Sequence, residues 1–234
     1  MRPRVPLIYA LCLVLGALLT MAAAIAHPVL AGDGAAQLAT IARTRDWAAI
    51  HWGFLFAFPL SITGLSGIVG ATVGTPGAGA TRAGLAVGVF AYACWMIIVA
   101  FMLGGGGALA GVAARGSVAP PPPPDLAATQ AVFLFDMVRP FALAAQRAGA
   151  FSLGLATSLF GWGLWCGRRE GVGEGVGEGL PRWTTVLAIA GGSAGAALAL
   201  ATPASSTLDQ AAFAPPVVWQ LLVGLVLLRV PRPT

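Results

Sequence analysis

The sequence predicts an all-α, polytopic membrane protein: a six-helix transmembrane bundle with one outer interfacial helix, forming a single integral membrane domain over residues 1–234. Composition is the first reason, because 58% of the residues are hydrophobic and 9% are charged, whereas soluble domains carry about 25% charged residues. The second reason is the mean hydropathy of +0.85. A chain this apolar has more apolar surface than one core of its length can bury. Together they exclude a soluble enzyme, a secreted disulfide scaffold and a disordered chain.

Six apolar runs match the roughly 20 residues that a helix needs to cross a bilayer. None shows the apolar–polar alternation of a transmembrane strand. They cover residues 5–26, 51–73, 83–103, 148–167, 183–201 and 215–228. The glycines at 104–107 are expected to loosen the end of the third run, and the repeated Gly-Val-Gly-Glu sequence predicts a flexible linker over 168–182.

Residues 125–139 are predicted to form an interfacial helix and not a span of their own. Polar residues recur at helical spacing along it, at Asp125, Thr129, Asp136 and Arg139. At the bilayer centre, Asp136 and Arg139 would each cost about 2.5–3.5 kcal/mol. On a helix surface they lie three residues apart and can form an ion pair. The helix is expected to end near Pro140, since proline interrupts backbone hydrogen bonding.

The charges predict an orientation with both termini in the cytoplasm and the chain in a bacterial-type inner membrane. Eight arginines in the connections then lie on the inner side and five on the outer side, a modest bias in the direction of the positive-inside rule. The inner ones are Arg2, Arg4, Arg82, Arg168, Arg169, Arg182, Arg229 and Arg232, and the outer ones are Arg43, Arg45, Arg115, Arg139 and Arg147. The first run also resembles a secretory signal with a small-residue cleavage site at 24–26. We expect a retained helix, because signal apolar regions are only about 7–15 residues long.

The two histidines are the strongest candidates for chemistry. His27 closes the first predicted helix and His51 opens the second, so both lie at the outer boundary of one hairpin. The loop between them holds Asp33 and Asp46, and Met21 lies just below His27. Imidazole is the commonest metal ligand, and imidazole with a thioether suits copper. The sequence therefore predicts a metal site of His27, His51, Asp33 and Asp46.

Three other interpretations of the histidines stay open. A haem would need well-separated ligand helices, whereas directly packed helices lie about 8–10 Å apart. Cleavage after Ala26 would leave a free amine on His27, which with both rings resembles a histidine brace. In the third interpretation, each histidine is an amphipathic ring at headgroup depth that holds no ligand. Asp46 has a structural explanation of its own, because it suits the N-cap of the second helix.

The function that the sequence favours is an accessory or assembly subunit of a larger membrane complex. Small residues at GxxxG spacing let helices approach closely, within one bundle or between chains. They occur at Gly70/Gly74, Gly84/Gly88, Gly107/Gly111, Gly163/Gly167 and Gly191/Gly195. The expected partners are lipid and other membrane subunits, with no nucleic acid, because a net charge of +5 is too diluted by apolar segments to form a basic surface.

Two further functions were weighed. A periplasm-facing copper or haem protein would use His27 and His51, and a small-molecule permease would use a polar cavity near Ser61, Thr63 and Ser66 beside Pro59. No HExxH or GxSxG motif is present, and no ionisable residue lies at mid-depth in the six predicted spans. The sequence therefore favours a protein that is not an enzyme.

Overall fold

The computed structural model describes residues 5–115, 126–169, 180–202 and 211–229. These residues are helical, joined by short connections, and contain no strand. The helices are α1 (Leu7–Ala26), α2 (Gly34–Arg43), α3 (Trp47–Ala71), α4 (Ala78–Phe101), η1 (Met102–Gly106), α5 (Gly107–Arg115), α6 (Leu126–Arg169), α8 (Arg182–Ala201) and α10 (Ala214–Arg229). The prediction of an all-α protein is confirmed.

Among the described residues, five helical segments are long and apolar enough to cross a bilayer. The first two are α1 and α3, the third is α4 together with η1 and α5 (Ala78–Arg115), and the last two are α6 and α8. α10 coincides with the sixth predicted run but has 16 residues, fewer than the roughly 20 that a straight crossing needs. The fold is therefore that of a helical membrane protein, with a sixth crossing that depends on α10.

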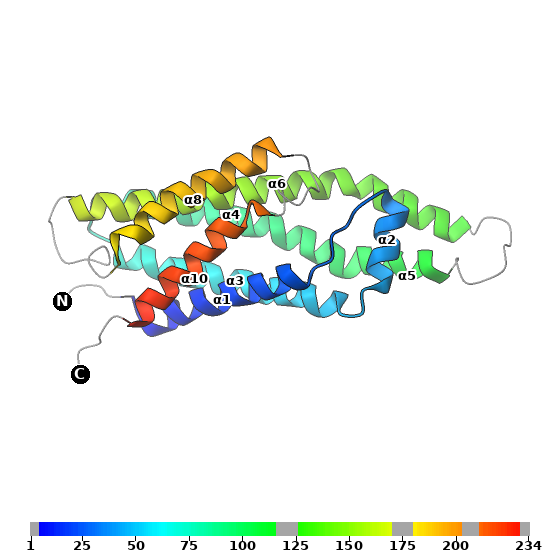
Figure 1. Cartoon of the computed structure of the whole chain (residues 1–234), viewed down its shortest axis with the longest axis horizontal. Coiled ribbons are helices and arrows are strands. Elements are labelled where there is room, and N and C mark those ends of the chain that lie inside the picture. Colours follow the sequence, from blue (N-terminus) through cyan, green and yellow to red (C-terminus); the bar gives the residue numbers. More distant parts are fainter. Residues whose placement is uncertain (1–4, 116–125, 170–179, 203–210, 230–234) are drawn as a thin grey trace.

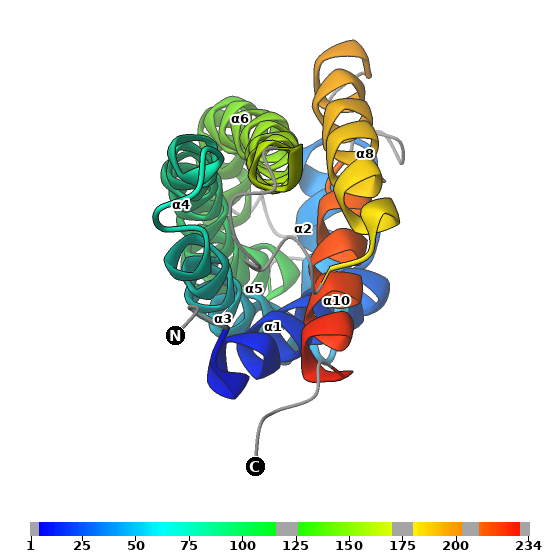
Figure 2. The same ribbon diagram turned by 90° about the vertical axis from the view of Figure 1, so that its left-hand side faces the viewer.

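The long helices form a closed ring in which each contacts the next, in the order α1, α3, α4, α6, α8, α10 and back to α1. Figure 2 shows this ring end on. Both chain termini lie at one end of the molecule, and α2 crosses the helices near the other (Figure 1). We call these the termini end and the α2 end.

α6 corrects the predicted break at Pro140. The interfacial helix expected over 125–139 and the span expected over 148–167 belong to one helix of 44 residues with Pro140 inside it. At 1.5 Å per residue this helix is about 66 Å long. One proline removes one backbone hydrogen bond, and the residues after it are mostly Ala, Leu, Gln and Arg, which favour helix.

The third predicted span also extends farther than expected. The helix does not loosen at the glycines but continues through a π-helical segment, Met102–Gly106, into α5. The indole Nε1 of Trp47 donates a hydrogen bond of 2.9 Å to the Met102 carbonyl oxygen. Single π turns inside α-helices occur frequently at functional sites.

α2 was not predicted, although the sequence carries its signals. The Asp33 carboxylate caps its first turn by accepting a hydrogen bond of 2.9 Å from the Ala36 amide. Leu38 and Ile41, three residues apart, are buried on its inner face. They belong to a small core at the α2 end, which we call the α2 cluster: Leu38, Ile41, Trp47, Ile98, Met102, Ala110 and Phe135.

The main core lies inside the ring and is held by close helix contacts. It includes Leu13, Leu65, Ile68, Tyr92, Phe160 and Trp219. A Cβ on Gly84 would contact the Ala156 carbonyl at 3.1 Å, and one on Gly195 would contact the Ala212 carbonyl at 2.6 Å. By contrast, a Cβ on Gly70, Gly74 or Gly111 would meet nothing within 4 Å. The GxxxG glycines therefore divide between internal packing and open faces.

Candidate functional site

The two histidines come together at the α2 end because α1 and α3 pack directly against each other. Gly16 of α1 lies so close to α3 that a Cβ there would be 2.6 Å from the Ser61 hydroxyl. His27 follows the last residue of α1, and His51 lies in the second turn of α3. Their ring centres are 5.3 Å apart, at an interplanar angle of 58°.

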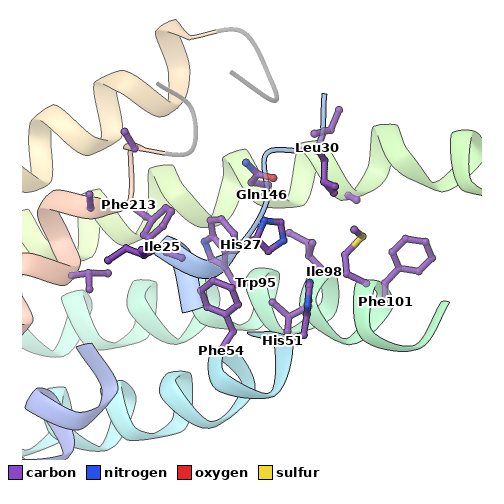
Figure 3. Close-up of a pocket in the computed structure, with 18 of the residues that line it drawn as sticks. Ile25, His27, Leu30, His51, Phe54, Trp95, Ile98, Phe101, Gln146 and Phe213 are labelled. Atoms are coloured by element: carbon purple, nitrogen blue, oxygen red, sulfur yellow. The ribbon is translucent and has the colours of Figure 1, made fainter. Parts of the chain in front are cut away.

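Trp47 packs against both imidazoles. Its ring centre is 4.1 Å from that of His51 and 5.3 Å from that of His27. Phe54 lies one turn farther along α3, 6.5 Å from His51 and 6.4 Å from His27. Figure 3 shows both histidines with Phe54 and Trp95 around them. The pair therefore has aromatic surroundings.

Backbone carbonyls fix the same nitrogen of each imidazole. His27 Nδ1 lies 2.8 Å from the Pro28 carbonyl oxygen, and His51 Nδ1 lies 2.7 Å from the Trp47 carbonyl oxygen. A carbonyl only accepts, so Nδ1 is the donor in both rings, and in a neutral ring Nε2 keeps its lone pair. Metal-bound histidines are commonly oriented by this kind of hydrogen bond.

Burial favours the neutral form of His27. It lowers the pKa of His27 below the ordinary value of 6.5, and the hydrogen bond to the Pro28 carbonyl offsets this only in part. His51 is 2% exposed. A neutral imidazole is the form that binds a metal, because protonation occupies the lone pair.

The histidines line a cavity of about 440 Å³ at the α2 end of the ring. Most of its wall is apolar or aromatic, from α1, α3, α4, α6 and α10 (Figure 3). The polar lining side chains are His27, His51, Gln37, Gln146 and Arg139, and the thioether side chains are Met21 and Met102. A largely apolar cavity with a few converging polar groups is the usual form of a small-molecule site.

The two aspartates of the predicted metal site have other positions. The Asp33 carboxylate caps α2, and Asp46 occupies the N-cap position of α3 without a side-chain cap hydrogen bond. Neither lines the cavity. Within residues 5–115, 126–169, 180–202 and 211–229, no three His, Cys, Asp or Glu side chains gather in a group that could hold a metal ion. Any metal held by His27 and His51 needs other ligands.

Several cavity residues were not identified from the sequence as site residues. Gln37 enters through the unpredicted α2, and Met102 through the unpredicted π segment. Arg139 and Gln146 lie on the part of α6 that was expected to be interrupted. The common signal of Met102, Arg139 and Gln146 is the uninterrupted helical register of residues 78–115 and 126–169.

The predicted polar patch in α3 is not assembled into a common site. Ser61 is buried against α1, Thr63 is exposed, and the Ser66 hydroxyl donates to the Thr63 carbonyl oxygen at 2.6 Å. None of the three lines the cavity at the α2 end.

The fold and the site define a class of protein: a multi-pass helical membrane protein with a closed helix ring and a histidine-containing cavity at one end. No family model, curated protein or solved structure matches this chain. The functional argument therefore depends on the chemistry of the cavity.

Proposed function

We propose that the protein is a membrane-embedded copper-binding protein that uses His27 and His51. The observation that carries this proposal is the separation of the two rings, 5.3 Å between centres. Two imidazoles on one tetrahedral ion, each with its nitrogen about 2.0–2.1 Å from the metal, have ring centres about 5 Å apart. The Nδ1 hydrogen bonds support the same role, because they leave Nε2 for the metal.

The thioethers favour copper over zinc. Met21 and Met102 line the same cavity as the histidines. Thioether sulfur is a soft ligand that selects Cu(I), whereas zinc sites use thiolate, imidazole and carboxylate. Asp33 and Asp46 are not needed in this set.

A haem held between the two histidines fits less well. Opposite axial ligands, each about 2 Å from one iron, would place the ring centres about 6 Å apart with a porphyrin between them. The observed 5.3 Å is shorter. A haem bound through one histidine is a separate outcome, which the absorption spectrum of the purified protein identifies.

The experiment is a Cu(I) titration of the detergent-purified protein against a competing chelator. His51→Ala and His27→Ala are each expected to lower the affinity at least tenfold, because each removes a ligand. Trp52→Ala is the matched control, since this neighbouring side chain is 50% exposed. Thermal unfolding confirms that each variant is folded. An unchanged copper affinity in folded His51→Ala contradicts the proposal.

The histidine brace is a variant of this proposal, in which His27 would become the first residue. α1 supports the retained form, because Leu13 is fully buried and Gly224 of α10 packs against Leu13 and Val14. The intact mass of the purified chain separates the two forms. A chain beginning at His27 would lack Met21, and the free amine of His27 would take the place of this thioether as a ligand.

The second candidate function is an accessory or assembly subunit of a larger membrane complex. Leu126, Phe133, Leu134, Met137 and Phe141 lie on one side of α6 and are 52–69% exposed. This part of α6 projects beyond α1 and α8 at the α2 end (Figure 1). Where this segment extends beyond the bilayer, an exposed apolar stripe of this kind is typical of an interaction site. The partner would be another membrane subunit with an apolar helix.

Blue-native electrophoresis in mild detergent tests the subunit proposal. A complex larger than one chain is expected, and Phe133→Asp with Met137→Asp should reduce it to the single chain. The control is Ala39→Asp, a change at an exposed position on α2, which is not a candidate membrane helix. A single chain before any substitution contradicts the proposal.

The cellular setting that we propose is a bacterial-type inner membrane, with both termini in the cytoplasm and the α2 end facing the periplasm. The distribution of arginines supports this orientation. Reporter fusions that are active on only one side of the membrane, placed after Thr234 and after Arg43, test it. Periplasmic activity of the fusion after Thr234 contradicts it.

A further inference from the structure

Among the described residues that line the cavity at the α2 end, Arg139 is the one permanently charged group, with no aspartate, glutamate or lysine beside it. Its Nε is buried and has no hydrogen-bond partner among the described residues. The predicted ion pair between Asp136 and Arg139, three residues apart on α6, is not formed in the described structure. Arg139 as a whole is half-buried, and a buried guanidinium nitrogen without a partner is costly.

A carboxylate is the group that best completes this site. Guanidinium and carboxylate match in geometry and form two parallel, charge-assisted hydrogen bonds. The strength of such a pair increases where water is excluded. The rest of the ligand must be apolar, because most of the cavity wall consists of aliphatic and aromatic side chains.

The cavity extends along α6 from Arg139 toward Trp95, which lies beside Gly149. Arg139 lies one turn from Phe135, which stacks on Phe101 with ring centres 6.5 Å apart. Seven residues along α6, or about 10 Å, separate Arg139 from Gln146. Beyond Gln146, Trp95 packs on Phe213 with ring centres 5.7 Å apart. A ligand with its acid group at Arg139 and an apolar chain directed toward Trp95 matches this arrangement.

Access from the lipid phase is provided by exposed apolar side chains at the rim. Ile25 at the end of α1 is 83% exposed and Val218 of α10 is 38% exposed, and both line the cavity. A water-soluble ligand would have to pass these side chains, whereas a hydrocarbon chain is stabilised by them. The volume of about 440 Å³ is in the range that holds a small organic molecule.

We propose that this cavity binds an amphipathic carboxylate drawn from the lipid phase, with its acid group on Arg139 and its hydrocarbon chain toward Trp95 and Phe213. The free fatty acids of the membrane and carboxylate-bearing ring pigments share this chemistry. The inference goes beyond the copper proposal and requires no bound metal, because it uses Arg139 and apolar walls and not the imidazoles.

The test uses chelator-treated protein in detergent and a fluorescent polyene fatty acid as the reporter ligand. Palmitate, hexadecanol and a metal-free dicarboxylic porphyrin are then compared as competitors. Palmitate and hexadecanol have the same chain, so their difference isolates the acid group. Palmitate is expected to bind at least tenfold more tightly than hexadecanol. Tighter binding of the porphyrin than of palmitate identifies a ring pigment as the source.

Three variants assign the effect to Arg139. Arg139→Gln should weaken palmitate at least tenfold and leave hexadecanol unchanged, and Arg139→Lys should lose less, because the charge remains. Arg115→Gln, an exposed arginine at the end of α5, is the matched control. Equal affinity for palmitate and hexadecanol in the native protein, or equal palmitate binding in Arg139→Gln and Arg115→Gln, overturns the proposal. If Arg139→Gln loses both ligands through misfolding, the native preference and Arg139→Lys decide.

Discussion

The interior of the helix ring and the α2 end differ in packing and in charge. In the ring, Tyr92 and Gln220 exchange hydrogen bonds of 3.1 and 2.8 Å, and the buried group left without a described partner on α8 is the neutral hydroxyl of Thr185. At the α2 end, a cavity remains, and the group without a described partner is the Nε of the charged Arg139. An unpaired charge costs more than an unpaired hydroxyl, so the α2 end carries the stronger demand for a ligand.

The largest effect is expected from Gly77→Ala, in the connection just before α4. Its new Cβ would overlap the carbonyl oxygen of Gly163, and backbone on both sides prevents a small adjustment. We expect a loss of about 3 kcal/mol or more, with little folded protein. Gly79→Ala is the control, because a Cβ there meets nothing within 4 Å. Thermal unfolding in detergent compares them, and equal stability would show that the ring is not tightly packed.

Leu38→Ala tests the α2 cluster. Leu38 is fully buried between α2 and the helices beneath it. We expect a loss of about 2–3 kcal/mol, the low end of the range for Leu→Ala, because α2 lies beside a cavity and can relax. Leu65→Ala in the ring, at 2% exposure, should cost more. Hydrogen exchange should show faster opening of α2 alone in Leu38→Ala, and protection lost equally everywhere would contradict the division into two regions.

Trp47→Phe removes the hydrogen bond to the Met102 carbonyl in the π segment. A loss of about 1 kcal/mol is expected for one buried hydrogen bond. Trp219→Phe is the matched variant in the ring, because Trp219 Nε1 donates to the Thr184 carbonyl at 2.9 Å. The two should destabilise the protein to a similar extent, but only Trp47→Phe should weaken copper binding. Equal copper affinity in both would show that Trp47 does not position the histidines.

The smallest effect is the pH dependence that His27 contributes. Burial lowers its folded-state pKa below 6.5, so below about that pH the unfolded chain binds more protons than the folded one. Stability is therefore full above pH 6.5 and declines as the pH falls from there through the folded-state pKa. His27→Gln should flatten this decline in thermal unfolding between pH 7.5 and 5.5. A native curve that rises on acidification would contradict the assignment.

The membrane helices could be predicted because each leaves a direct pattern in the sequence. The apolar runs at 5–26 and 183–201 nearly match α1 and α8. The continuity of α6 could not be predicted in the same way, since it depends on whether packing offsets one lost hydrogen bond at Pro140. α2 was missed because ten residues give a weak periodic signal.

The candidate site could be predicted only for the residues that one helical hairpin brings together. His27 and His51 follow from the ends of one hairpin, and the structure brings them together. Arg139 and Met102 reach the cavity only because the helices that carry them continue without a break. A break at Pro140 would have rotated Arg139 out of register with Ala142 and Gln146 on the same helix. Long-range register, and not residue type, determines this part of the site.

The length of α6 has a further consequence. Its 44 residues carry Arg139 in the first half and Arg168 in the last turn, and the helix runs from the α2 end to the termini end (Figure 1). A helix resists compression along its axis, because shortening it would break many backbone hydrogen bonds at once. Because α6 also packs against both α4 and α8, one stiff rod forms part of the cavity wall and part of the main core.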